Sequence, residues 1–211
     1  MSEAMVEIKD AITDLAELAR MYTQPAAPSV RKVTRRLTGA YRRIIEASPF
    51  VAVATCGADG LDCSPRGDSA GFVRVADEQT LLLPERRGNN RIDSVRNLVT
   101  DPRIALLFLV PGVQETLRVN GHAMISRKPE LCDSFAVNGN APRVIIVVRI
   151  ESVYFQCGRA ILRSQLWNSS LFRSAADLPT AGTMLGEATA GEEGGPAYDA
   201  ALPERMRTTL Y

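Results

Sequence analysis

The chain has 211 residues, of which 45% are hydrophobic and 23% are charged, a balance typical of a globular protein with one domain and extensions. Lys and Arg exceed Asp and Glu by only one, whereas dedicated nucleic-acid and membrane-surface binders normally carry a clear basic excess. The single histidine, His122, excludes a metal site built from several imidazoles of one chain. The near-zero net charge therefore argues against a dedicated nucleic-acid or membrane-surface binder.

The basic residues are strongly biased toward arginine. Of the 25 basic residues only Lys9, Lys32 and Lys128 are lysines, which leaves 22 arginines. Planar guanidinium groups suit phosphate and carboxylate recognition, and a codon preference for arginine explains the same count equally well.

The termini and the cysteines indicate a reducing compartment. No apolar run reaches the roughly 20 residues of a membrane span, and the first ten residues lack the apolar segment of a secretion signal. We therefore predict a cytoplasmic protein without a membrane partner. The four cysteines form no Cys-x-x-Cys, so no metal site is expected. Cys56 and Cys63 flank a predicted turn at 57–60, where two reduced, buried thiols are favoured over a disulfide.

The first 48 residues are predicted to be a helical extension. Apolar residues recur at helical spacing over 5–20, and Pro25 and Pro28 then interrupt the chain. Ser29 is a candidate cap for a second helix over 30–47, which has an apolar stripe and an Arg-rich face.

Residues 49–170 are predicted to form the principal domain. Here the sequence pattern changes from that of helices to that of short strands. Strands are predicted over 50–56, 61–66, 71–75, 80–84, 103–110, 115–126 and 143–154. Helices are predicted over 91–99 and 129–137, and 158–167 fits a helix or a loop. Many short strands with tight turns favour a closed antiparallel barrel, a mainly β fold with flanking helices.

The last 41 residues, 171–211, are predicted to be a flexible tail. Segment 174–197 is rich in glycine and poor in large apolar residues, which is typical of a linker or a mobile lid. Residues 199–211 could form a short terminal helix.

One nine-residue segment concentrates groups that bind anions. Leu83–Arg91 leaves a strand, turns through Gly88 and enters a helix, carrying three arginines and two asparagines. Guanidinium groups beside a helix N-terminus favour a phosphate cradle. A solvated loop is the alternative, but Arg66 and Arg118 on other strands favour the anion site. Trp167, after two arginines, could stack on a planar ring or simply pack at the sheet edge.

Several motifs together resemble the pyridoxamine 5′-phosphate oxidase-like FMN-binding split barrels. They are 64–68 (SPRGD), 71–75 (GFVRV), 81–84 (LLLP), 87–94 (RGNNRIDS), 106–112 (LLFLVPG), 115–121 (ETLRVNG) and 157–167 (CGRAILRSQLW). The resemblance covers roughly residues 35–170. It implies a six-stranded antiparallel split barrel with flanking helices. It also implies a homodimer with two FMN molecules at the subunit interface.

The resemblance assigns cofactor-binding roles by position. Arg66 and Gly67 would line the flavin ring, Leu83 and Pro84 would present backbone groups, and Asn97 would face the ribityl chain. The phosphate would lie in the cradle, formed by Arg87, Gly88, Asn89, Asn90 and Arg91. The partner subunit would contribute Glu115, Thr116, Arg118, Arg159, Arg163 and Trp167.

The implied activity is that of an FMN-dependent oxidoreductase acting on an unknown small molecule. Arg66 and Arg118 are candidates for stabilising reduced flavin, and no catalytic acid or base is identified. The C-terminal Arg-x-His substrate motif of the oxidases proper is absent, so pyridoxamine 5′-phosphate is not the expected substrate. The alternatives are a non-catalytic flavin-binding protein, a haem-binding split barrel that uses His122, and a nucleic-acid module on the Arg-rich face of 31–43. The net charge disfavours the last.

Overall fold

The structure is a computed structural model that describes residues 11–211. The chain divides into two compact units, Met1–Val33 and Thr34–Tyr211. Within residues 11–33, the first unit contains two short helices, α1 (Leu15–Met21) and α2 (Ala27–Arg31). Asp14 caps α1 by accepting a hydrogen bond from the amide of Ala16 at 3.0 Å. Of the helix predicted over 5–20, residues 5–10 lie outside the described part of the chain, and only 15–20 are helical within it.

The prediction of one continuous helix over 30–47 is wrong for the middle of that range. The chain forms α2 and then, in the second unit, α3 (Gly39–Ala47), with extended backbone between them. Thr34 forms an isolated antiparallel bridge with Val153, which draws this stretch out of a helix. Thr38, not Ser29, caps α3, and Ser29 lies inside α2.

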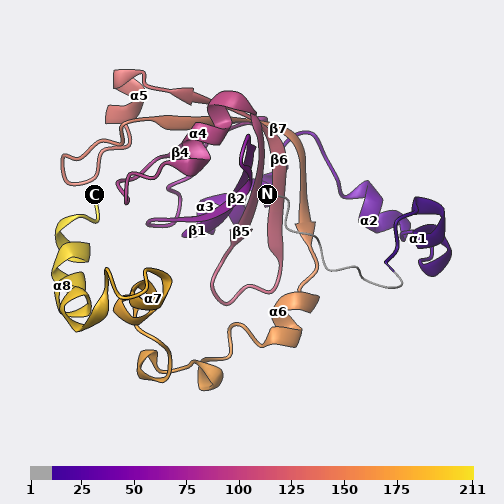
Figure 1. Cartoon of the computed structure of the whole chain (residues 1–211). Helices are drawn as coiled ribbons and strands as arrows, with labels where there is room; N and C mark the ends of the chain where they lie inside the picture. The colour runs from indigo at the N-terminus through magenta and orange to yellow at the C-terminus, as the bar shows by residue number, and fades with distance from the viewer. Residues whose placement is uncertain (1–10) are drawn as a thin grey trace. The chain divides into compact units, whose positions relative to one another are not determined.

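The second unit is built on one antiparallel sheet of seven strands, one more than the resemblance implied. The strands are β1 (Phe50–Gly57), β2 (Gly60–Gly67), β3 (Arg74–Asp77), β4 (Thr80–Pro84), β5 (Arg103–Leu109), β6 (Thr116–Ser126) and β7 (Ile145–Gln156). Their order is β2-β1-β5-β6-β7-β4-β3, and Figure 1 shows the sheet with helices around it. The predicted fold class, a mainly β split barrel with flanking helices, is confirmed.

Alternating side chains place the core on one face of these strands. Val51 and Val53 of β1, Leu106 and Phe108 of β5 and Val119 of β6 are all buried. Helix α4 (Asp93–Thr100) packs on the same face, where Leu98 is buried. A β-bulge lies in β6 between Asn120 and Gly121.

The β1–β2 hairpin does not place its cysteines opposite each other. Cys56 pairs with Leu61 and Cys63 pairs with Ala54, so the two thiols are diagonal neighbours, and all four cysteines are free. The expectation that both are buried is wrong, because Cys63 lies on the exposed side of an edge strand and Cys56 is only half-buried.

The segment predicted as an irregular linker, 174–197, contains a helix. Beyond α5 (Pro129–Asp133) and α6 (Arg159–Ser164), the chain forms two single 3₁₀ turns, α7 (Ala181–Ala188) and α8 (Gly195–Thr208). Asp199 of α8 accepts hydrogen bonds from the amide of Gly182 at 2.7 Å and from the hydroxyl of Thr180 at 2.6 Å. Glycines at this contact let the two helices approach closely, so the composition that resembled a linker is that of a tight helix pair. No helix within residues 11–211 has the length and hydropathy needed to cross a bilayer.

Candidate cofactor cleft

A cleft of about 1350 Å³ lies where the two ends of the sheet approach each other. Its walls are the end of β2, the end of β4, loop 85–92, the start of α4, loop 140–144, and Leu210 and Tyr211. Because β2 is one edge of the sheet and β4 lies beside the other edge, only the curling of the sheet brings these segments together.

Half of the predicted cofactor-binding residues line this cleft. They are Arg66, Gly67, Pro84, Arg87, Gly88, Asn89, Asn90 and Arg91. The cluster contains the whole phosphate cradle together with the end of β2, which the sequence places about 20 residues earlier.

The backbone of the cradle is shaped to receive an anion. Asn90 and Ile92 have positive φ angles of 63° and 53°, which turn the chain sharply before α4. The side chain of Asn89 accepts a hydrogen bond from the amide of Arg91 at 3.1 Å. The N-terminus of α4 has no side-chain cap, so its first amides stay available at the positive end of the helix dipole.

The two cradle arginines differ in their partners. Arg91 forms an ion pair of 2.9 Å with Asp93 and is 75% exposed. Arg87 forms no ion pair within residues 11–211, and its side chain is exposed at the cleft. A Cβ built on Gly88 meets no atom within 4 Å, so a ligand can approach the backbone there. These features fit a phosphate group.

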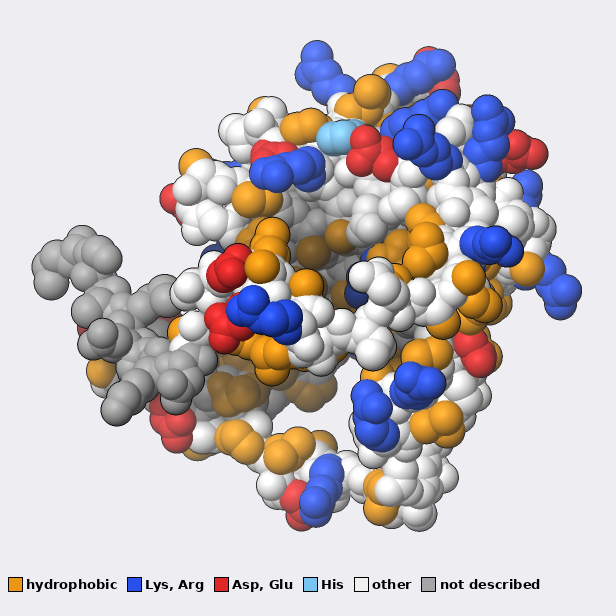
Figure 2. Space-filling model, turned by 90° about the vertical axis from the view of Figure 1, so that its right-hand side faces the viewer, with side chains coloured by type: hydrophobic (Ala, Val, Ile, Leu, Met, Phe, Trp, Pro, Cys, Tyr) orange, Lys and Arg blue, Asp and Glu red, His pale blue; other side chains and the backbone are white. Residues whose placement is uncertain are grey.

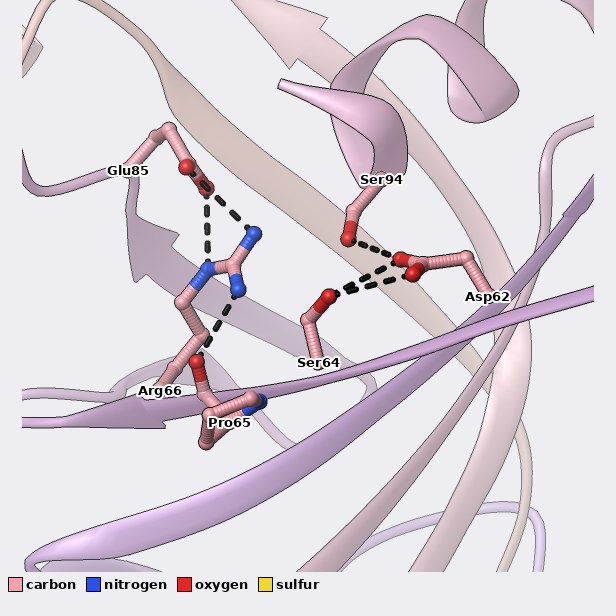
Figure 3. A network of polar contacts seen from close by, with 6 residues as sticks. All are labelled: Asp62, Ser64, Pro65, Arg66, Glu85 and Ser94. Atoms are coloured by element: carbon pink, nitrogen blue, oxygen red, sulfur yellow. Dashed lines mark hydrogen bonds and ion pairs between the residues drawn. The ribbon is translucent and has the colours of Figure 1, made fainter. Parts of the chain in front are cut away.

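Arg66 is held by Glu85 across the cleft (Figure 3). Nε of Arg66 donates to Oε2 of Glu85 at 3.1 Å and Nη2 donates to Oε1 at 3.3 Å. Nη1 donates to the carbonyl of Pro65 at 3.0 Å. Both side chains of the pair are only 16–17% exposed. Since a guanidinium has five N–H groups, two remain for a ligand.

Asp62 connects β2 to the start of α4, as Figure 3 also shows. Its Oδ2 accepts hydrogen bonds from the hydroxyl of Ser94 at 2.7 Å and from that of Ser64 at 3.0 Å. Ser94 is buried in the first turn of α4. The carboxylate thus fixes the N-terminus of α4 against the strand, which positions the cradle.

A second ion pair joins the same two walls. Nε of Arg86 donates to Oδ2 of Asp68 at 2.8 Å, and the Asp68 side chain is 5% exposed. Burial alone raises the pKa of Asp68, but hydrogen bonds from the amide of Ser69, the hydroxyl of Tyr211 and Arg86 outweigh it and hold that pKa below its ordinary value. Asp68 is therefore ionised at neutral pH.

The remaining predicted residues do not line the cleft. Leu83 is fully buried in the core, and the side-chain Nδ2 of Asn97 donates to the hydroxyl of Thr55 at 3.1 Å, so the Asn97 side chain faces β1. The residues expected from a partner subunit are Glu115, Thr116, Arg118, Arg159, Arg163 and Trp167, none of which lines the cleft of its own chain. Within this group Arg118 donates to the hydroxyl of Tyr154 at 3.1 Å, and the indole of Trp167 donates to the carbonyl of Val113 at 2.8 Å.

His122 lies on another face, on β6. Its Nδ1 is 2.9 Å from Oε1 of Glu151, and its neighbours in register are Arg103 and Arg149. Figure 2 shows cationic and acidic side chains beside the histidine. A pocket of about 530 Å³ adjoins it, lined mainly by aliphatic side chains such as Met124 and Val147. Among residues 11–211 no cluster of His, Cys, Asp and Glu could hold a metal ion.

Among the cleft residues that the sequence did not predict, four make the ion pairs and hydrogen bonds described above: Glu85, Asp62, Asp68 and Tyr211. Glu85 lies inside the arginine-rich segment Leu83–Arg91, so the sequence allowed the prediction that its negative charge pairs with Arg66. No local signal identifies Tyr211, since it is 143 residues from its partner Asp68.

Comparison with known proteins places the chain in a family. The family model described as pyridoxamine 5′-phosphate oxidase matches residues 37–157, which is more than half of the chain. The chain therefore belongs to the pyridoxamine 5′-phosphate oxidase family. A search of curated proteins found no match.

Three solved structures illustrate what the chain is similar to. HupZ of Group A Streptococcus is 17% identical, with a TM-score of 0.48, covering 57% of this chain and 94% of its own. A candidate pyridoxamine 5′-phosphate oxidase of Lactobacillus delbrueckii is 22% identical, with a TM-score of 0.45 and coverages of 57% and 95%. An F420 reductase is 21% identical, with a TM-score of 0.42 and coverages of 56% and 98%.

Proposed function

We propose that this protein binds FMN in the cleft and is an FMN-dependent oxidoreductase of a small molecule. The observation that carries the proposal is the convergence of the cradle, Arg87–Arg91, with the end of β2 in one cleft of a split barrel. The cradle offers two guanidinium groups and free helix amides to the phosphate. Bound FMN would supply the hydride or electron chemistry, and the protein would supply binding and access.

The residues around the cleft have separate tasks in this proposal. Arg87 and Arg91 would bind the phosphate, and Asp62 would keep α4 in place beneath it. Arg66 would donate its two remaining N–H groups toward the flavin ring. Because Glu85 neutralises much of its charge, Arg66 would act more as an oriented hydrogen-bond donor than as a free cation.

A homodimer is part of the proposal. The six residues expected from a partner lie outside the cleft of their own chain, which is the arrangement a shared site requires. The outer face of β1 and β5 is also apolar and only half-buried, with Ala52, Ala54, Leu107 and Leu109 along it. Leu61 on the neighbouring edge strand is 87% exposed. Such a patch is suited to a self-complementary interface.

The test is a flavin titration followed by a turnover assay. FMN fluorescence should be quenched on binding to the purified protein, and the bound flavin should be reduced by NAD(P)H or by a substrate. Free fluorescence at saturating protein would refute FMN binding. Bound FMN without turnover against either donor and dioxygen would favour the non-catalytic flavin-binding alternative.

Haem on His122 is a second candidate. An imidazole that ligates a metal usually donates the N–H of its other ring nitrogen to a carboxylate. Nδ1 of His122 lies beside the carboxylate of Glu151, and the ring borders a mainly aliphatic pocket. A haem titration that gives a Soret shift in the wild type and none in His122→Ala would support this candidate. An equal shift in both proteins would remove His122 as the ligand.

A further inference from the structure

The C-terminal arm, defined here as residues 169–211, ends inside the proposed cofactor cleft. Leu210 and Tyr211 line the cleft together with Arg66, Gly67 and Asp68. The arm carries its own helix pair, α7 and α8, whose hydrogen bonds through Asp199 are internal. Figure 1 shows this pair beside the barrel, with the end of the chain turned back toward it.

Tyr211 is the point at which the arm is attached to the barrel. Its hydroxyl donates to Oδ1 of Asp68, the residue after β2, at 2.9 Å. The Arg86 guanidinium lies 5.5 Å from the centre of the Tyr211 ring. Asp68 and Arg86 are themselves paired and nearly buried, so Tyr211 rests on a rigid, charged seat.

We propose that the arm is a cover for the cleft and that Tyr211 is its latch. With Tyr211 seated on Asp68 and Arg86, the arm restricts the path to the β2 side of the cleft. When the hydroxyl leaves Asp68, the arm swings on its first segment, 169–180, which has two single turns and only exposed side chains. The latch would thereby set how fast a ligand enters and leaves. Only the identity of that ligand, FMN, rests on the proposed function. The closure of the arm does not depend on it.

The charge of the seat supports this role. The hydroxyl donates to Asp68, which raises the pKa of Tyr211, so the neutral donor form is kept at physiological pH. The groups that donate hydrogen bonds to Asp68 are the Arg86 guanidinium, the Tyr211 hydroxyl and the backbone amide of Ser69. A ligand that binds Arg86 would weaken the Arg86–Asp68 ion pair on which Tyr211 lies, whereas a ligand that does not contact Arg86 would leave the pair unchanged.

Closure can be measured without any flavin. Nitroxide labels at Ala200 of α8 and Glu130 of α5, in a chain whose Cys56, Cys63 and Cys157 are replaced by serine, report the distance between the arm and the barrel. Tyr211→Phe keeps the ring and removes the donor, so the distance distribution should broaden toward longer values. Tyr198→Phe is the matched control, because that ring lies on α8 against Arg205. Equal distributions in Tyr211→Phe and in the parent would overturn the latch.

Ligand exchange provides the second measurement. Removing a hydrogen bond to a charged group shifts an equilibrium by about tenfold or more, so FMN should dissociate from Tyr211→Phe about tenfold faster, with Tyr198→Phe unchanged. If FMN does not bind any of these proteins, the proposed function fails while the label distances still decide the latch. A distribution that changes on dilution would show that Tyr211 docks on another copy, which overturns closure within one chain.

Discussion

Glu85 holds Arg66 by two hydrogen bonds across the cleft, joining β4 to the opposite edge of the sheet. The pair is only 16–17% exposed, so solvent screens it weakly. The carboxylate lies in the same cleft as the cradle, where it opposes the binding of an anionic ligand.

Glu85→Gln should therefore strengthen FMN binding. Removing the negative charge frees Arg66 and lowers the repulsion of the phosphate, and we expect an affinity about three- to tenfold tighter at low salt. Fluorescence titration at two salt concentrations measures this gain, which should shrink as salt rises. Glu78→Gln, in an Arg–Glu pair that is 67–69% exposed and outside the cleft, is the control. Weaker binding by Glu85→Gln would show that Glu85 orients Arg66 more than it repels the ligand.

Arg91→Ala should weaken FMN binding. A charged hydrogen bond contributes about 1.5–3 kcal/mol, and because Arg91 is 75% exposed and shares its charge with Asp93, we expect the low end, roughly a tenfold loss of affinity. Arg96→Ala, on α4 but outside the cleft, should leave affinity unchanged. The same fluorescence titration with FMN measures the affinities of Arg91→Ala and Arg96→Ala. Equal affinities for Arg91→Ala and the wild type would mean that the phosphate binds elsewhere.

Asp68→Asn should destabilise the fold at neutral pH. It leaves Arg86 nearly buried without its counter-charge, and breaking such a pair costs about 3 kcal/mol. The folded pKa of Asp68 lies below its ordinary 3.8, so its contribution is present above that value and is lost as pH falls through the folded pKa. The gap between wild type and variant should therefore narrow in acid.

Urea unfolding at pH 7, 5 and 3 measures that gap. Asp101→Asn is the control: hydrogen bonds from Arg103 lower the pKa of Asp101 to about 2, but the pair lies at the surface and solvent screens it. A gap for Asp68→Asn that stays constant from pH 7 to pH 3 would exclude this carboxylate as the titrating group.

Gly121→Ala should destabilise the barrel at the β6 bulge. A Cβ there would lie 2.0 Å from the carbonyl oxygen of Arg149, a backbone atom that cannot move without breaking the β6–β7 ladder. We expect a loss of about 2–3 kcal/mol in the free energy of unfolding. Gly39→Ala has open space around the new methyl and should be neutral or slightly stabilising. Chemical denaturation of both variants makes the comparison, and equal stabilities would contradict the close approach at Gly121.

Leu107→Asp should separate the proposed homodimer. Leu107 is on the outer face of β5, so the charge should disrupt an interface without entering the core. Sedimentation should show monomers where the wild type is dimeric, with an unchanged circular dichroism spectrum and weaker FMN binding. Val99→Asp, on α4 and 74% exposed, is the control. A wild type that sediments as a monomer would refute the shared site.

Local pattern predicted the regular strands well and the long-range pairings poorly. The apolar run 103–110 predicted β5, observed at Arg103–Leu109, because a strand buried between neighbours is continuous in sequence. The strand predicted over 71–75 is observed at Arg74–Asp77, since Gly71 has a φ of 84° and belongs to a turn. The break in the predicted helix 30–47 depends on Val153, 119 residues away, which no local pattern contains.

The same division applies to the cleft. The cradle is contiguous, so its arginines, asparagines and glycine could be found together in the sequence. Three hydrogen bonds of the cleft join residues that are far apart in the sequence. The separation is 19 positions for Arg66 and Glu85, 32 for Ser94 and Asp62, and 143 for Tyr211 and Asp68. Such contacts exist only after the sheet has curled.

The two cross-cleft ion pairs also define how the barrel closes. β2 and β3 are the free edges of the sheet, and within residues 11–211 no ladder of backbone hydrogen bonds joins them. The seam is fastened instead by Arg66–Glu85 and Arg86–Asp68, which are side-chain contacts. A backbone ladder would open only with the fold, whereas charges can exchange partners one at a time. The closure of the barrel at this seam therefore depends on the charges of four side chains and not on the backbone.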